Sequence, residues 1–310
     1  MSKKENGEDL TISKPVPADY KRRRGDRSDA RYVREADGFH KVMDLLFPTR
    51  CNNETYLSEV FDLGPVKEYM AKKNAEIEGI EDEIPYTIFH FVVAALVKTI
   101  TLRPKMNTYI ARGRIYQRYH VSASFVVKKY FGDDAEEGLA FINEAENMNL
   151  ESMHEAIRKQ VKFCRGEQKD SSADSMDLVA KLPYSLVRFV VWACRQLDKF
   201  DLAPRSFIAT DPYHTTALLS NVGSIKLNAG YHHLANWGTN SVIVLVGKKQ
   251  PRIFFNEDYS FDVKESIELG ITIDERLADG YYYSRTIQLF KKIFENPELL
   301  EEPFETEVEY

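Results

Sequence analysis

The sequence has few cysteines and no long apolar run, and these absences exclude several classes of protein. Its 310 residues include only three cysteines, at positions 51, 164 and 194. An odd number of cysteines without Cys-x-x-Cys spacing argues against both a disulfide framework and a zinc site. No apolar run approaches the roughly 20 residues that span a bilayer, and the first residues lack the apolar segment of a signal peptide. We therefore expect a soluble cytoplasmic protein that makes no contact with a membrane.

An excess of positive charge is also missing. The formal net charge is −6, which gives no indication of nucleic-acid binding. The sequence contains no His-x-x-x-His pattern, no P-loop and no Gly-x-Gly-x-x-Gly motif, so neither a bound metal nor a nucleotide-binding fold is expected. Hydrophobic residues make up 43% of the chain, which is enough to build a sizeable core.

The first part of the chain differs in composition from the rest. Residues 1–30 are polar and contain Pro15 and Pro17, so we expect a poorly ordered arm followed by a single catalytic domain over residues 31–310. The basic run at residues 21–24 has two interpretations. It is either solvated, or it contacts a phosphate group or a neighbouring subunit.

Hydrophobic periodicity predicts both helices and strands along the domain. Helices are expected at residues 66–76, 87–101, 150–164, 185–200 and 281–294. Strands are expected at residues 56–62, 115–127, 206–209, 216–219, 241–246, 252–256 and 266–273. These elements do not alternate as regular β-α-β units, so a two-layer α/β sandwich, with a mixed sheet covered by helices on one face, is favoured over a Rossmann or barrel fold. Apolar residues surround the helix at 185–200, which predicts its burial on most sides.

The most informative motif is the heptapeptide Asp-Glu-Arg-Leu-Ala-Asp-Gly at residues 274–280, which lies between an alternating strand pattern and a helical one. It resembles the His-x-x-x-Asp-Gly signature of the CoA-dependent acyltransferase superfamily, in which Glu275 takes the place of the histidine. The superfamily includes the chloramphenicol acetyltransferases. The closest resemblance is to the catalytic core of the dihydrolipoamide acyltransferases of 2-oxoacid dehydrogenase complexes. Ser-Asn-Val-Gly at residues 220–223 is similar to the family's Ser-Asn-Leu-Gly, and the resemblance extends roughly over residues 31–303.

The resemblance implies a chloramphenicol acetyltransferase-like fold and a homotrimer with its active site between subunits. Coenzyme A or acyl-CoA would be a substrate, and the acceptor would be a small thiol, hydroxyl or amine. Ser220 would donate a hydrogen bond to the tetrahedral oxyanion, while Asn221 and Arg276 would belong to the conserved motifs. The chain leaves no room for the lipoyl domain of the larger family members, so the resemblance leaves open whether it associates with a dehydrogenase complex.

The resemblance also assigns structural roles at the end of the heptapeptide. Asp279 would be a buried carboxylate paired with an arginine of the N-terminal region, and Arg31 and Arg34 are the two candidates. Gly280 would permit the sharp turn into the last helix.

Glu275 leaves two functional hypotheses open. A free glutamate has a pKa of ~4.3, compared with ~6.5 for histidine, although burial in an apolar pocket can raise a glutamate to ~6–7. The protein is therefore either an acyltransferase with Glu275 as an unusual base, or a non-catalytic trimer that binds acyl-CoA or serves as a scaffold. His232 or His233 could instead supply the base, entering from the loop after the serine block.

Overall fold

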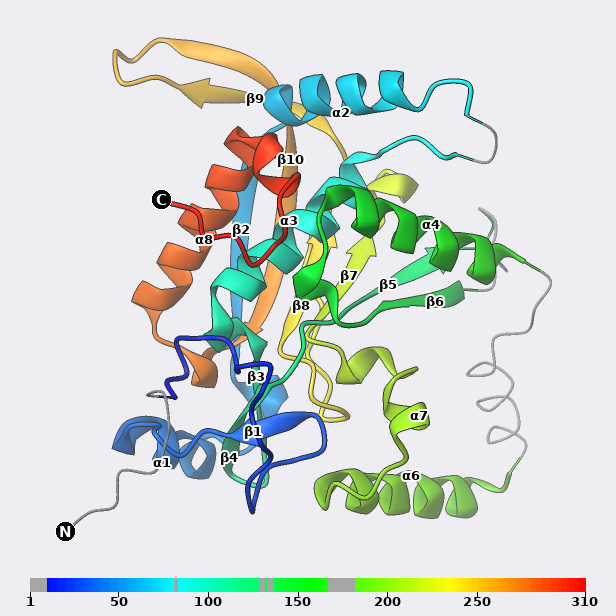
Figure 1. Cartoon of the computed structure of the whole chain (residues 1–310), viewed down its shortest axis with the longest axis vertical. Helices are drawn as coiled ribbons and strands as arrows, with labels where there is room; N and C mark the ends of the chain where they lie inside the picture. The colour runs from blue at the N-terminus through cyan, green and yellow to red at the C-terminus, as the bar shows by residue number, and fades with distance from the viewer. Residues whose placement is uncertain (1–9, 81–82, 129–131, 133–136, 167–181) are drawn as a thin grey trace.

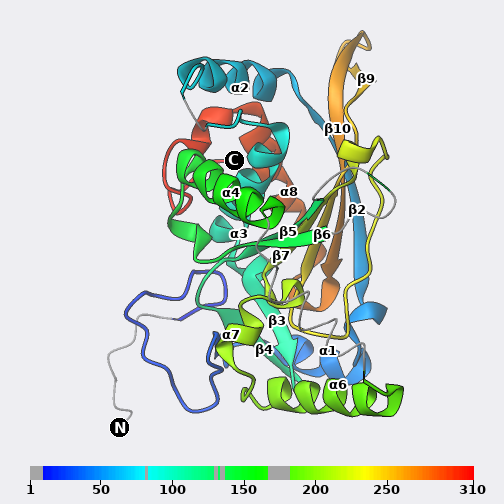
Figure 2. The same ribbon diagram turned by 90° about the vertical axis from the view of Figure 1, so that its right-hand side faces the viewer.

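A seven-stranded mixed sheet forms one layer of the structure, and helices that cover one face of this sheet form the other (Figures 1 and 2). The computed structural model describes residues 10–80, 83–128, 132, 137–166 and 182–310. The strands of the large sheet are β2 (Glu54–Asp62), β5 (Ala123–Lys128), β6 (Glu137–Ile142), β7 (Ala217–Asn221), β8 (Val242–Val246), β9 (Gln250–Phe255) and β10 (Phe261–Asp274). The predicted two-layer α/β sandwich is confirmed.

The order of the large sheet is β2-β10-β8-β7-β5-β6, and β9 pairs with the first half of β10. The pairs β5–β7 and β7–β8 are parallel, and the others are antiparallel. The covering helices are α2 (Gly64–Glu76), α3 (Ile88–Leu102), α4 (Leu150–Arg165) and α8 (Gly280–Glu295). All four helices begin within two residues of the predicted positions.

Helix α3 lies at the centre of the core because almost all of its side chains are apolar. Its residues from His90 to Thr101 are all buried. Thr87 accepts a hydrogen bond from the backbone N–H of His90, and the His90 ring accepts one from the backbone N–H of Thr87, which forms a capping box. The chain therefore enters this helix at a fixed position beneath the sheet.

The other face of the sheet is covered by a loop rather than by helices (Figure 2). Residues 226–240 run along this face between β7 and β8 and place Leu234 against Ile243 and Leu245. A Cβ atom on Gly270 would lie 1.9 Å from the carbonyl oxygen of Gly230. Only glycine allows the two backbones to approach so closely, so the path of the loop is fixed by direct backbone contact.

A smaller sheet and three helices lie at the opposite end of the molecule from the β9–β10 ribbon (Figure 1). These elements are β1 (Ala30–Tyr32), β3 (Thr108–Ala111), β4 (Arg114–Arg118), α1 (Gly38–Leu46), α6 (Tyr184–Lys199) and α7 (Arg205–Ile208). Two predictions are wrong here. Residues 206–209 form part of α7 and the turn after it rather than a strand, and no residue of α6 is buried.

The predicted N-terminal arm is described from residue 10 onward and contains no helix or strand before β1. The residues of its basic run are exposed, as the solvated interpretation predicts, and Arg22 also pairs with Asp201 at 2.9 Å. The guanidinium of Arg27, which is buried, donates to the carboxylate of Asp198 at 2.7 Å. Ion pairs therefore hold the end of the arm against the segment around the C-terminus of α6.

None of the helices in the described part of the chain is long and apolar enough to cross a membrane.

Candidate active site

Ser220 lies near the carboxyl end of β7, on the face of the sheet that the loop covers. Its neighbours in the strand, Leu219 and Asn221, point to the other face because side chains alternate along a strand. Leu218, two residues away, packs in the cluster with Leu234 beneath the loop. Ser220 is half-buried, and its backbone lies opposite Leu245 of β8.

A cavity of about 570 Å³ opens beside the serine block. Asn221, Gly223 and Ser224 form one wall, and the first residues of α3 form another. Its volume is within the range of about 300–1,000 Å³ that is typical of small-molecule sites.

Three lysines border this cavity and make it electropositive. Lys67 of α2 forms an ion pair with Glu265 at 2.6 Å. Lys248 and Lys249 follow β8, and within the described part of the chain neither forms an ion pair. A group that carries phosphates would therefore find positive charge at this rim, next to an interior that includes Ile88, Phe89 and other apolar side chains.

Glu275 lies at the opposite end of β10, in the short 3-10 helix η6 (Glu275–Leu277). Its side chain is exposed, and one carboxylate oxygen accepts a hydrogen bond of 2.9 Å from the hydroxyl of Thr55. Its backbone N–H donates to the carbonyl of Asn53 at 2.9 Å. Within one chain, no apolar pocket encloses the carboxylate.

The buried carboxylate of the heptapeptide is Asp274, not Asp279. Asp274 is 0% exposed, and Arg276 donates to both of its oxygens, at 2.8 and 2.7 Å. Arg276 also donates to the carbonyl of Phe47 at 2.9 Å, which attaches the end of α1 to η6. This bidentate pair fixes the backbone on which Glu275 is carried.

The predicted pairing of Asp279 with an arginine is wrong within the chain. Asp279 is exposed and caps α8 by accepting a hydrogen bond of 2.8 Å from the backbone N–H of Tyr282. Arg31 pairs with Glu35, and Arg34 pairs with Asp26. The sequence Asp-Gly before a helical pattern is a typical N-cap signal, so local rules explain the observed role. Gly280 is the first residue of α8, as expected for a turn into the last helix.

Ser220 and Glu275 do not meet within one chain. Ser220 pairs with Leu245, Leu245 pairs with Gly270, and Glu275 lies five residues further along β10. Standard strand dimensions separate the two positions by about 16 Å along the sheet and about 10 Å across it. The hydrogen bond from Thr55 also places Glu275 towards the helix-covered face, because Leu57, two residues on, packs against the main core.

The structure does not bring His232 or His233 to Glu275. His232 is exposed, and the imidazole Nδ1 of His233 lies 2.8 Å from the carboxylate of Glu54. Glu54 also accepts hydrogen bonds from the hydroxyl of Tyr56 and from a backbone N–H of the loop. These contacts lie on the loop face, and they hold the exposed His233 ring against Glu54.

Sequence reasoning missed Asn53, Glu54 and Thr55, at the start of β2 and just before it, which contact Glu275 and His233. They come next to the heptapeptide because Glu54 pairs with Asp274 in the β2–β10 ladder. Strand pairing over 220 positions leaves no local signal in the sequence. An alternating pattern that begins with Glu-Thr-Tyr indicates a strand, but not its partner.

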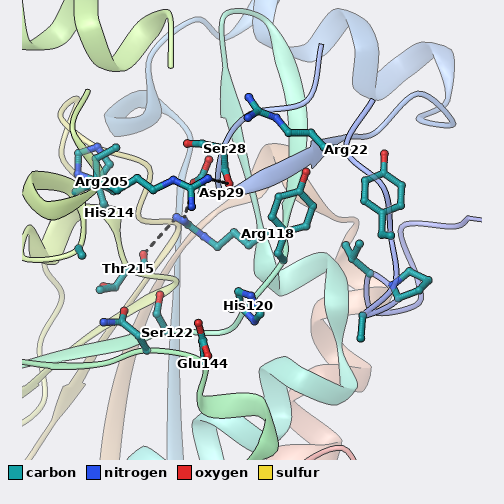
Figure 3. A pocket seen from close by; sticks show the side chains of 18 residues that line it. Arg22, Ser28, Asp29, Arg118, His120, Ser122, Glu144, Arg205, His214 and Thr215 are labelled. Carbon is teal, nitrogen blue, oxygen red and sulfur yellow. Dashed lines mark hydrogen bonds and ion pairs between the residues drawn. The ribbon is translucent and has the colours of Figure 1, made fainter. Parts of the chain in front are cut away.

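A second cavity, of about 500 Å³, lies where the N-terminal arm, the β4–β5 connection and α7 meet (Figure 3). Arg118, at its centre, is 6% exposed and donates to the carbonyl of Thr239 at 2.9 Å. His214 lies 3.0 Å from Asp211 and 3.5 Å from Asp198. Burial alone would lower the pKa of His214, but the two carboxylates raise it above its ordinary value. Acidic partners therefore already compensate the basic groups in this cavity.

Among the described residues, no group of three or more histidine, cysteine or acidic side chains lies close enough together to hold a metal ion.

Comparison with known proteins gives a clear result only at the level of structure. No protein-family model matches the sequence, and no curated protein matches it. The solved structures that match include a probable dihydrolipoamide acetyltransferase from Listeria monocytogenes, with 15% sequence identity, a TM-score of 0.56, and coverage of 83% of this chain and 88% of that one.

Two further structures have the same architecture. The cubic core of the pyruvate dehydrogenase multienzyme complex is 11% identical, with a TM-score of 0.56 and coverage of 84% of this chain and 87% of that one. A chloramphenicol acetyltransferase is 12% identical, with a TM-score of 0.52 and coverage of 86% and 99%. The chain therefore has the chloramphenicol acetyltransferase-like fold that the heptapeptide suggested. At these identities the comparison establishes the fold alone.

Proposed function

We propose that the protein catalyses CoA-dependent acyl transfer to a small thiol, hydroxyl or amine acceptor, in a homotrimer whose active site lies between subunits. The cavity that Asn221 and Gly223 line, with lysines at its rim and apolar side chains inside, is the observation that carries this proposal; Ser220 does not line it, and its side chain lies on the opposite face of the sheet. Its chemistry fits a phosphate-bearing thioester, in which the phosphates meet the lysines and the less polar arm enters the cavity. The fold, which is shared with two kinds of acetyltransferase, supports this class of reaction by analogy.

In the proposed reaction, Glu275 of one subunit takes the proton from the acceptor's S–H, O–H or N–H group. The acceptor atom attacks the thioester carbon, and the hydroxyl of Ser220 from the adjacent subunit donates a hydrogen bond to the oxyanion that forms. Collapse of this intermediate breaks the carbon–sulfur bond. The departing CoA thiolate receives the proton held by Glu275, which restores the carboxylate. Asp274 and Arg276 position the backbone of Glu275 and do not touch the substrate.

The separation of Ser220 from Glu275 within one chain agrees with a site that needs two subunits. A donor and a base that act on one substrate must both lie within about 3 Å of their target atoms, directly or through one water. The distance of about 16 Å along the sheet within one chain exceeds that limit many times over. Residues from two copies can satisfy it.

Release of free CoA thiol from a panel of acyl-CoAs and acceptors tests the proposal, with wild type compared to Glu275→Gln. Loss of general-base assistance is expected to slow turnover by about a hundred- to ten-thousandfold. Glu295→Gln, which changes an exposed glutamate at the end of α8, is the matched control and should retain full turnover. Equal turnover by Glu275→Gln and wild type would remove Glu275 from the reaction.

A non-catalytic acyl-CoA-binding or scaffold protein is the second candidate, and the exposed position of Glu275 favours it. A carboxylate held by Thr55 in solvent lacks the enclosure expected of a general base. Calorimetric titration with CoA distinguishes the two functions. Saturable CoA binding without turnover of any acyl-CoA, unchanged by Glu275→Gln, would establish the binding function instead.

A further inference from the structure

Helix α6 has an apolar surface that the described part of the chain leaves exposed. Tyr184, Phe189 and Trp192 are 77%, 60% and 56% exposed, and no residue of the helix is buried. An isolated helix of this length is marginal in water, and its stability normally comes from packing of its apolar face. Residues that would elsewhere form a core are here presented to the surroundings.

Polar contacts attach the C-terminal half of α6 to the rest of the chain, and Val187, Val190 and Cys194 are half-buried. Arg27 donates to the carboxylate of Asp198 at 2.7 Å and to its carbonyl at 2.8 Å, and His214 lies 3.5 Å from the same carboxylate. Arg195 donates to the carbonyl of Asn236 at 3.3 Å. The helix is thus fixed near its C-terminal end while its aromatic side chains stay uncovered.

Helix α1 has a second uncovered apolar surface at the same end of the molecule (Figures 1 and 2). Phe39, Leu45 and Leu46 are exposed, Leu45 by 77%. Arg276 binds the carbonyl of Phe47, so this surface lies beside η6 and Glu275. Whatever covers α1 will also change the surroundings of Glu275.

The combined apolar area is larger than a monomer usually leaves in water. The large apolar side chains of more than 40% exposure on and just after the two helices are Phe39, Val42, Leu45, Leu46, Phe47, Tyr184, Leu186, Phe189, Val191, Trp192, Leu197, Phe200 and Leu202. At about 100 Å² each, the five on the α1 side expose about 500 Å² and the eight on the α6 side about 800 Å², whereas the largest apolar patch on a typical monomer is about 300–600 Å². The two surfaces face to face would bury about 1,300 Å² in total, which is within the range of about 1,200–2,000 Å² for a stable interface.

We infer that α6 of one copy of the chain docks on α1 of a second copy and thereby encloses Glu275. Two different surfaces on one chain form a heterologous interface, which closes into a ring when the rotation allows it. Among the charged side chains, α6 exposes Arg188, and the α1 side exposes Glu275 together with Lys41 and with Asp37, which pairs with His40 at 2.6 Å. The second copy of the chain is thus the partner of the proposed acyl-transfer site. Only the role of Glu275 after enclosure rests on the proposed function.

A cysteine pair tests the contact directly. Leu45→Cys on α1 and Phe189→Cys on α6 are combined in one chain, with Cys51→Ser and Cys194→Ser in every variant to remove other accessible thiols. After oxidation the double-cysteine chain should migrate as covalent dimers and trimers, and each single-cysteine chain should stay monomeric. Ile253→Cys, on the β9–β10 ribbon at the other end, replaces Leu45→Cys in the control and should give no oligomer with Phe189→Cys.

Sedimentation of the protein without any acyl-CoA gives an independent measurement. Phe189→Glu with Trp192→Glu should convert the assembly to monomers without loss of helix content by circular dichroism. Persistence of the assembly in that variant, or covalent dimers of Phe189→Cys alone, would overturn the α6–α1 contact. Monomeric wild type that floats with vesicles of anionic phospholipid through α6 would also overturn it. Because neither measurement involves turnover, an absence of acyl transfer would leave the contact standing.

Discussion

At the Ser220 end of the sheet, one chain forms a cavity, whereas at the Glu275 end an exposed carboxylate lies beside uncovered apolar helices. The first end is closed by the tight loop after β7 and by the capped start of α3. The second end is rigid in its backbone, through Asp274 and Arg276, but open in its surroundings. The difference fits the proposed function, in which the substrate cavity lies within one chain and the reacting carboxylate is enclosed by a second chain.

The largest effect is expected from loss of the ion pair between Asp274 and Arg276, at the Glu275 end of the sheet. Arg276→Leu leaves the buried carboxylate of Asp274 without its bidentate partner, and Arg50 at 4.0 Å does not replace it. Loss of one partner of a buried pair costs about 3–5 kcal/mol, so the free energy of unfolding measured with urea should fall by that amount.

Two variants control for this loss. Adding Asp274→Leu to Arg276→Leu removes the unpaired charge and should recover much of the stability. Lys291→Ala breaks the exposed pair with Glu59 and should cost no more than about 1 kcal/mol. If Arg276→Leu is no more destabilising than Lys291→Ala, the open end is not held by this pair.

Ser220→Ala removes the proposed oxyanion donor from the closed end. Turnover of acyl-CoA should fall about a hundredfold or more, because a donor aimed at a developing charge acts mainly in the transition state. Binding of CoA, measured by calorimetry, should stay within a few-fold of wild type. A variant that binds CoA much more weakly, with unchanged turnover at saturation, would make Ser220 a binding residue only.

Acid should destabilise the closed end through the buried histidine pair. His90 lies 3.0 Å from His154, and burial, reinforced by His154, lowers the pKa of His90 to about 3. Below about pH 6.5 this histidine binds a proton in the unfolded chain, whereas in the folded chain it stays neutral. The free energy of unfolding therefore decreases as the pH falls through that value. The loss at pH 5 should be about 2 kcal/mol relative to pH 7.5.

Hydrogen exchange at pH 7.5 and pH 5 locates this effect. Amides at the start of α3, which line the cavity beside Asn221 and Gly223, should lose protection before those of β10 near Glu275. His90→Asn, which keeps a capping side chain but does not titrate, should show a smaller dependence on pH. Equal loss of protection at both ends would mean that acid acts on the whole fold instead.

Lys248→Ala with Lys249→Ala should have the smallest effect. The two lysines lie at the rim of the cavity, where each phosphate contact is partly screened by water and salt. The KM for acyl-CoA should rise about three- to tenfold at low salt, with kcat nearly unchanged. The effect should shrink at high salt, and a KM difference that does not depend on salt would argue against a phosphate contact.

Local sequence predicted the positions of most helices and strands, but it did not predict which segments they contact. Alternation predicted β2 and β10, and helical spacing predicted α3 and α8, because each pattern is set by neighbouring residues. The surroundings of Glu275 depend on Thr55 and on α1, which are brought there by strand pairing across most of the chain. Periodicity showed that α6 is apolar, but an apolar helix is buried only where some surface exists to bury it. That surface is absent from the described part of a single chain.

The backbone contact between Gly230 and Gly270 makes one position of the sheet intolerant of any side chain. A Cβ atom on Gly270 would collide with the main chain of Gly230, whereas a Cβ atom on Gly230 would meet no atom within 4 Å. A substitution at position 270 therefore has to displace the loop from the sheet, whereas a substitution of the exposed Glu275 does not.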